Sequence, residues 1–159
     1  MTKIFLLTLW LSFFGVQPDY QIKKTWLFSK TEYSGNVPRL PGGKQVSGIK
    51  KTLLFYIETG KDQSLPQWQT AYFNGSSYEV TTLESRQDSV AVGIDKNAKR
   101  PVVLKPATGD KIVQLKMTLT ATQSVVENDG FVLSGMFKKS AVTMRTDRLP
   151  VELVPDMMP

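Results

Sequence analysis

Apolar and polar residues alternate along much of the chain, and this alternation predicts β-strands. The clearest case is residues 113–121, where Val, Leu, Met, Leu and Ala alternate with Gln, Lys, Thr and Thr. Successive side chains of a strand point to opposite faces of a sheet, so a period of two indicates a half-buried strand with one wet face. No segment after Pro18 has apolar residues at helical spacing over three turns. We therefore expect no long helix.

Other segments extend the strand pattern. Alternation over residues 20–28 predicts a strand that places Tyr20, Ile22, Trp26 and Phe28 on one face. Residues 53–57 are all apolar, which predicts a central strand covered on both sides. Further short strands are predicted at residues 90–94, 102–104 and 151–154.

Two hairpins are predicted from turn residues. Asn74 and Gly75 separate the apolar-rich segments 68–73 and 77–83, and they supply the positive φ angles of a two-residue type I′ turn. Either of two registers would place Ala71, Phe73, Tyr78 and Val80 on a common face. The second hairpin spans residues 131–144, with Lys138 and Lys139 at its tip, although two lysines suit this turn type poorly.

About nine short strands in one domain are typical of an all-β fold. We expect an antiparallel β-sandwich of eight to nine strands, with a closed lipocalin-like barrel as the alternative. Lipocalins carry a tryptophan on their first strand two residues after a glycine, whereas Lys24 and Thr25 precede Trp26 here. The sequence therefore shows no family signature.

The N-terminus is typical of a secretory signal peptide. A short basic start with Lys3 leads into an apolar run from Ile4 to Phe14, which ends near Gly15 and Pro18. This run is shorter than the roughly 20 residues of a membrane-spanning helix, so we expect no integral membrane anchor after processing. We predict a signal peptide at 1–17, a single all-β domain at 18–155 and a frayed C-terminal tail at 156–159. An N-terminal strand or helix of the mature fold is the alternative.

Composition excludes several kinds of chemistry. The 159 residues include no cysteine and no histidine, so disulfides, thiolate or imidazole metal ligands, cysteine nucleophiles and histidine-dependent triads are absent. We expect no metal and no cofactor. Export without cysteine favours a bacterial periplasm or exterior, and the predicted localisation is periplasmic or secreted.

The longest segment without alternation runs from residue 30 to 50 and contains four glycines and two prolines. Loops of this length in a compact domain are commonly functional. Tyr33, Arg39 and Leu40 are therefore candidates for an exposed binding tip, and a merely mobile connection is the alternative.

Exposed aromatic side chains are a second candidate binding feature. Trp68 and Tyr72 lie four residues apart, opposite Phe73 on the predicted strand. If their face is wet, they form an exposed pair that could stack on sugars or peptides. The predicted binding residues are Tyr33, Arg39, Trp68 and Tyr72.

Catalytic patterns are weak. Ser47 and Lys50 form an S-x-x-K string, but the string leads into a strand, where the two side chains point to opposite faces, and its usual partner motifs are missing. The carboxylates near predicted strands are Glu58, Glu79, Glu84 and Asp88, and no pair among them stands out. We expect no enzyme, with a carboxylate or Ser/Lys hydrolase as the third hypothesis.

The net charge of +6 comes from basic residues scattered along the chain rather than from one run. Such a surface is attracted to anionic polymers, whereas nucleic-acid binding would require a recognisable motif. The leading hypothesis is a non-enzymatic binding or interaction module of the cell envelope, with an envelope or extracellular protein or polysaccharide as partner and no nucleic acid. The alternative function is a lipocalin-like carrier of a small apolar ligand.

Overall fold

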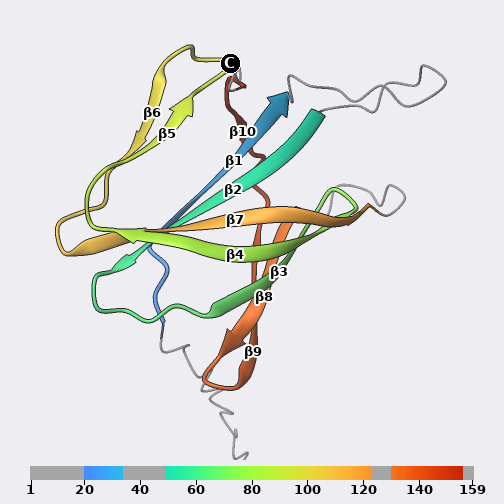
Figure 1. Cartoon of the computed structure of the whole chain (residues 1–159). Coiled ribbons are helices and arrows are strands. Elements are labelled where there is room, and N and C mark those ends of the chain that lie inside the picture. The colour runs from blue at the N-terminus through green and yellow to red at the C-terminus, as the bar shows by residue number, and fades with distance from the viewer. Residues whose placement is uncertain (1–19, 34–48, 123–129, 156–159) are drawn as a thin grey trace, which may run out of the picture.

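A computed structural model describes residues 20–33, 49–122 and 130–155, and these residues form strands and turns without a helix (Figure 1). The all-β prediction is confirmed. The strands are β1 (Lys24–Tyr33), β2 (Ile49–Gly60), β3 (Gln67–Phe73), β4 (Ser76–Arg86), β5 (Val90–Ile94), β6 (Pro101–Leu104), β7 (Asp110–Thr122), β8 (Phe131–Phe137), β9 (Ser140–Thr146) and β10 (Val151–Glu152).

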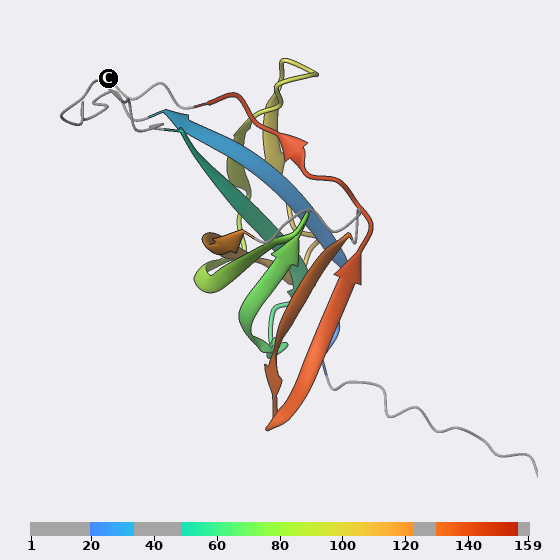
Figure 2. The ribbon, with the colours of Figure 1, turned by 90° about the vertical axis from the view of Figure 1, so that its right-hand side faces the viewer.

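Eight strands form one continuous sheet in the order β10-β1-β2-β7-β4-β3-β8-β9. Every pairing in it is antiparallel except that of β10 with β1. The sheet curls strongly, so that β3, β8 and β9 turn away from the direction of β1 and β2 (Figure 2). The strands at its two ends, β9 and β10, do not pair with each other. The described strands therefore form a curled open sheet, and β5 and β6 form a separate two-stranded sheet.

The main hydrophobic core fills the inside of the curl. It joins side chains from β1, β2 and β7 to side chains from β3, β4 and β8, and Phe55 stacks on Phe131 with ring centroids 4.9 Å apart. Its buried members are Leu27, Leu53, Phe55, Ile57, Trp68, Ala71, Phe73, Val80, Val113, Leu115, Met117, Phe131 and Leu133. Burial of this apolar surface is the main force that holds the two halves of the curl together.

A second core lies on the other face of β1, β2 and β7. The small sheet of β5 and β6 covers this face (Figure 1). Its buried members are Phe28, Tyr56, Val90, Val92, Leu104, Ile112 and Leu153. Because Phe55 and Ile57 point into one core and Tyr56 into the other, β2 is buried on both faces. The prediction of a doubly covered central strand at residues 53–57 is confirmed.

The segment around β10 attaches the small sheet to the large one. Leu153 donates its backbone N–H to Ser29 of β1 at 2.9 Å, and Val154 donates to Ile94 of β5 at 2.8 Å. Glu152 accepts a hydrogen bond from Lys96 at 2.8 Å, which lowers the pKa of this carboxyl. The predicted strand at residues 151–154 is confirmed as the shorter β10, followed by an isolated bridge at Leu153.

Both predicted hairpins are confirmed. Asn74 and Gly75 have φ of 47° and 71°, and Phe73 pairs with Ser76, which selects one of the two registers considered. At the second turn Lys138 and Lys139 also adopt positive φ, 47° and 67°. This geometry matches the right-handed twist of paired strands, and the ladder between β8 and β9 imposes it on residues that do not favour it.

The predicted face of residues 20–28 is partly wrong. Trp26 and Phe28 pack in the second core, as one face of β1. Ile22 packs instead against the main core, and Tyr20 contacts Trp68 edge-on at 6.5 Å. Regular pairing in β1 starts only at Lys24, so the alternation of a strand does not extend back to these two residues.

The strand at residues 113–121 is confirmed within β7, but its inner face is not buried throughout. Leu119 is 50% exposed, because the pairing of β7 with β2 ends at Met117. Near the start of β7 the opposite face is also covered, because Ile112 is 1% exposed and packs in the second core.

The long connection predicted at residues 30–50 is shorter than expected. Residues 30–33 continue β1, residues 49–50 begin β2, and Tyr33 pairs with Ile49. Tyr33 therefore belongs to a strand, because the antiparallel ladder extends past the point where apolar alternation stops. The predicted signal peptide, Arg39, Leu40 and the C-terminal tail lie outside the described residues.

A β-bulge in β3 brings two backbones unusually close. The pairing of β3 with β8 shifts by one residue between Trp68 and Thr70, and Gly135 lies opposite Trp68. A Cβ on Gly135 would collide with the carbonyl oxygen of Gln67 and lie 2.8 Å from Trp68 Cα. Only glycine fits at this position without a shift of the backbone.

We predict that Gly135→Ala lowers the free energy of unfolding by about 1–3 kcal/mol, because the added methyl group overpacks two backbones. Urea denaturation measures this loss. Gly60→Ala is the control, since its nearest neighbour is the side chain of Gln63, which can move. Equal stability of the two variants would contradict the close approach.

Candidate functional site

An open hollow of about 490 Å³ lies on the outer face of β3, β4, β7 and β8. We call it the Tyr72 hollow. Its lining residues are Thr70, Ala71, Tyr72, Ser77, Tyr78, Glu79, Thr120, Val132 and Ser134. Four of these carry aliphatic hydroxyl groups, Glu79 carries a carboxylate and Tyr72 carries a phenol ring, so the hollow combines many hydrogen-bonding groups with aromatic surface.

The strand register sets the order of the polar side chains. Cross-strand neighbours share a face and lie about 5 Å apart, so the pairings place outer side chains in rows that cross the strands. One row is Thr143, Ser134, Thr70, Glu79 and Thr118, and the next is Arg145, Val132, Tyr72 and Ser77. Each of the four adjacent strands β9, β8, β3 and β4 thus contributes one residue to each row, and Thr118 of β7 extends the first row.

The main core fixes the position of these rows. Ala71, Phe73 and Leu133 alternate with the outer residues along β3 and β8 and are buried. Side chains on a paired, packed sheet hold their relative positions better than side chains on a loop. The hollow is therefore a preformed surface.

The expectation of an exposed Trp68–Tyr72 pair is wrong for Trp68, which is 3% exposed and belongs to the main core. Two residues four apart share a face only in a regular strand. The β-bulge before Thr70 adds one residue, so Trp68 points inward and Tyr72, which is half-buried, points outward. Of the predicted binding residues, Tyr72 lines the hollow and Trp68 does not, whereas Arg39 and the side chain of Tyr33 are not described.

Tyr78 lies at the border of the hollow and the main core. Burial raises the pKa of its phenol, and a hydrogen bond with Ser76 opposes this rise. The phenol is therefore neutral at physiological pH, and its hydroxyl can both donate and accept a hydrogen bond.

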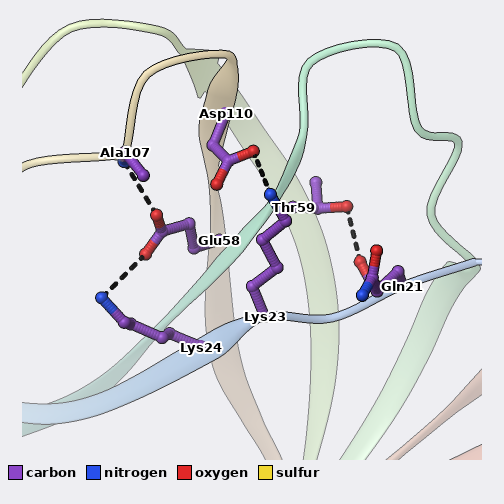
Figure 3. A network of polar contacts seen from close by, with 7 residues as sticks. All are labelled: Gln21, Lys23, Lys24, Glu58, Thr59, Ala107 and Asp110. Carbon is purple, nitrogen blue, oxygen red and sulfur yellow. Dashed lines mark hydrogen bonds and ion pairs between the residues drawn. The ribbon is translucent and has the colours of Figure 1, made fainter.

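A second group of polar side chains lies at the start of β1 and the end of β2 (Figure 3). Glu58 is 1% exposed, and its Oε1 accepts the backbone N–H of Ala107 at 2.9 Å. The Nζ of Lys24 lies 3.8 Å from its Oε2. Beside this pair, Lys23 donates to the buried carboxylate of Asp110 at 2.6 Å. We call these four charged residues the Glu58 cluster.

The contacts of the Glu58 cluster are structural. Glu58 holds the turn at residues 105–109, and Thr59 donates its hydroxyl to the carbonyl oxygen of Gln21 at 2.7 Å (Figure 3). Neither Glu58 nor Asp110 lines the Tyr72 hollow or either of the two further hollows described below. These carboxylates therefore attach the chain before β1 and the β6–β7 turn to the central strand.

The carboxylate and Ser/Lys pairs weighed from the sequence do not converge among the described residues. Glu58 is buried, Glu79 lines the Tyr72 hollow, and Asp88 is exposed after β4. The side chains of Glu84 and Lys50 are not described, and Ser47 lies outside the described residues. Within those residues no group of three acidic side chains could hold a metal ion.

A second hollow, of about 470 Å³, lies between the Asn74–Gly75 turn and the segment before β10. Leu53 and Phe73 of the main core and the exposed Leu149 line it together with polar residues. Because Leu53 and Phe73 belong to the core that fills the inside of the curl, this hollow does not lead into an empty interior.

No protein-family model, curated protein sequence or solved structure matches this chain. Within the residues that the structure describes, no helix has the length and apolarity needed to cross a membrane. The geometry of the hollows is therefore the only basis for assigning a function.

Sequence reasoning missed most of the hollow. Thr70, Ser134 and Glu79 are ordinary surface residues by type, and they are far apart in the sequence. The alternation in the two predicted hairpins does place all three on outward-facing positions. Only the pairing of β3 with β8, which joins the two hairpins, places them in one row.

We predict that Glu58→Ala lowers the free energy of unfolding by about 1–3 kcal/mol, because it leaves the backbone N–H of Ala107 and the ammonium of Lys24 without their partner and empties a buried position. Glu58→Gln keeps an acceptor for Ala107 and should lose less. Denaturant unfolding measures both variants. Wild-type stability of Glu58→Ala would show that the cluster does not hold the turn.

Proposed function

We propose that the protein is an exported, non-enzymatic binding module whose outer sheet face binds a polysaccharide of the cell envelope or exterior. The observation that carries the proposal is the Tyr72 hollow, where an aromatic ring is surrounded by hydroxyl and carboxylate groups on a rigid sheet. In this view the curled sheet is a sandwich-like scaffold, and its free outer face is the functional surface.

The chemistry of the hollow suits a sugar chain. The ring of Tyr72 can stack on the apolar face of a sugar, while Thr70, Ser77 and Ser134 can exchange hydrogen bonds with its hydroxyl groups. Adjacent strands are about 4.8 Å apart, so the rows offer polar groups at regular intervals to a ligand that crosses the strands. A repetitive polymer matches this arrangement better than a compact ligand does.

The basic balance of the protein is compatible with this partner. The net charge is +6 for the full chain and +5 without the predicted signal peptide, which contains Lys3, and this excess favours approach to anionic envelope polymers. Arg145 stands at one end of the row that contains Tyr72. A lipocalin-like carrier is less well supported, because large side chains such as Phe55, Phe73 and Phe131 occupy the inside of the curl.

We predict that Tyr72→Ala weakens binding to the preferred polysaccharide about tenfold, equivalent to roughly 1.4 kcal/mol, because the stacking surface is lost. Tyr72→Phe keeps the ring and should bind nearly as well as wild type. Co-sedimentation with peptidoglycan, chitin and cellulose, and affinity electrophoresis in alginate, measure the binding.

Val103→Ala, on the exposed face of β6, is the matched surface control and should leave binding unchanged. The proposal fails if none of these polymers binds, or if Tyr72→Ala binds as tightly as wild type. It also fails if purified protein cleaves a glycosidic, ester or peptide substrate and loses that activity on mutation of Glu79.

Export is tested by fractionation of the cell that produces the protein. Mass spectrometry of the extracytoplasmic fraction should find a mature chain whose first residue lies between positions 15 and 19, because the apolar segment 4–14 directs secretion and is then removed. An intact precursor in the soluble interior of the cell would contradict this part of the proposal.

A further inference from the structure

Strand β9 ends the large sheet, and among the described strands only β8 pairs with it. Its seven residues, Ser140–Thr146, contain no proline, and the pairing with β8 has no bulge. A regular edge of this kind presents backbone N–H and C=O groups that can pair with another chain.

The hairpin geometry tells which groups of β9 point outward. Lys138 and Lys139 form a two-residue turn, so the flanking residues Phe137 and Ser140 make a hydrogen-bonded pair. Hydrogen-bonded pairs recur at every second residue. The backbone groups of Ala141, Thr143 and Arg145 therefore point away from β8 and are available to an added strand.

A basic groove lies beside the end of this edge. It has a volume of about 500 Å³ and separates the end of β9 from the start of β1. Its lining residues are Ile22, Lys23, Lys24, Thr25, Trp26, Met144, Arg145, Thr146 and Arg148. Four of them are basic and none is acidic.

The Glu58 cluster neutralises only part of this charge. Lys23 and Lys24 each face a carboxylate of the cluster. Arg145 and Arg148 have no carboxylate partner within the described residues. The guanidinium of Arg148 donates a hydrogen bond to the carbonyl oxygen of Thr25, at 3.4 Å. An occupant with negative side chains would complement these two guanidinium groups.

A second copy of the chain fits this edge less well. Antiparallel pairing of two β9 strands about Thr143 would bring Lys138 and Lys139 of one copy toward the basic groove of the other. Asp147 is the single acidic residue among residues 138–148, which would face each other in this pairing, so like charges would dominate it. Charge complementarity thus favours an acidic partner over self-association.

We propose that β9 receives an acidic, extended protein segment, which adds to the sheet as a further strand and places its carboxylates against Arg145 and Arg148. The backbone of Ala141, Thr143 and Arg145 provides the hydrogen bonds of this β-strand addition. The site is separate from the Tyr72 hollow, and its occupancy does not depend on polysaccharide binding.

A labelled seven-residue peptide that alternates glutamate with threonine or valine is the probe, and fluorescence anisotropy with purified protein measures its binding. We expect saturable binding that weakens with added salt. A peptide with lysine in place of glutamate should not bind. A glutamate peptide with N-methylated backbone nitrogens at alternate positions should bind at least about tenfold more weakly, because it cannot complete the ladder.

Two variants separate the contributions of backbone and charge. Thr143→Pro removes an outward N–H without removing a bond to β8, and it should weaken peptide binding at least about tenfold, whereas the matched control Thr143→Val should not. Arg145→Gln combined with Arg148→Gln should weaken binding and its salt dependence, whereas Lys105→Gln, at an exposed position after β6, should change neither.

The inference is overturned if the glutamate peptide does not bind, if the lysine peptide binds equally well, or if N-methylation has no effect. The comparison of the three peptides uses the wild-type protein, so it tests the inference even if Thr143→Pro fails to fold. A concentration-dependent dimer that Arg145→Gln strengthens would assign the edge to a second copy instead. Tyr72→Ala should leave peptide binding unchanged, so failure here and failure of the polysaccharide proposal are distinguishable.

Discussion

Burial of strand β2 on both faces is the constraint on which the rest of the structure depends. Phe55 and Ile57 enter the core inside the curl, and Tyr56 enters the core beneath the small sheet. A strand covered twice needs a layer on each side. Strands β3, β4 and β8 of the curled sheet provide one layer, and the β5–β6 sheet provides the other. Among the polar side chains buried on β2, Glu58 has Ala107 and Lys24 as partners, and Thr59 donates to Gln21.

The same arrangement leaves the other half of the sheet covered on one face only. Strands β3, β4 and β8 bury inner side chains, and the inner Val142 and Met144 of β9 are half-buried, while the outer side chains of these strands form polar rows. The core fixes the positions of these strands, and their outer side chains remain available to solvent or a ligand. The division of the sheet into a doubly covered half and a singly covered half explains why both proposed binding surfaces lie on the second half.

Local patterns in the sequence predict the strands and both hairpins, because alternation and turn residues act over a few residues. They do not predict the order of strands in the sheet, which depends on pairings between distant segments such as β3 with β8. They also miss the β-bulge before Thr70. This single extra residue sends Trp68 into the core and leaves Tyr72 outside, so the predicted aromatic pair is divided. The opposing Gly135 is a signal of the bulge that only the register makes interpretable.

The central claim is that the singly covered half of the sheet carries the binding surface. Amide chemical-shift mapping of the ¹⁵N-labelled protein during titration with soluble fragments of the polysaccharide that it binds tests this claim most directly. We expect shifts concentrated in residues 70–79 and 132–134, with little change in β1, β2, β5 and β6. Shifts concentrated in β5 and β6, or along the central strand β2, would contradict it.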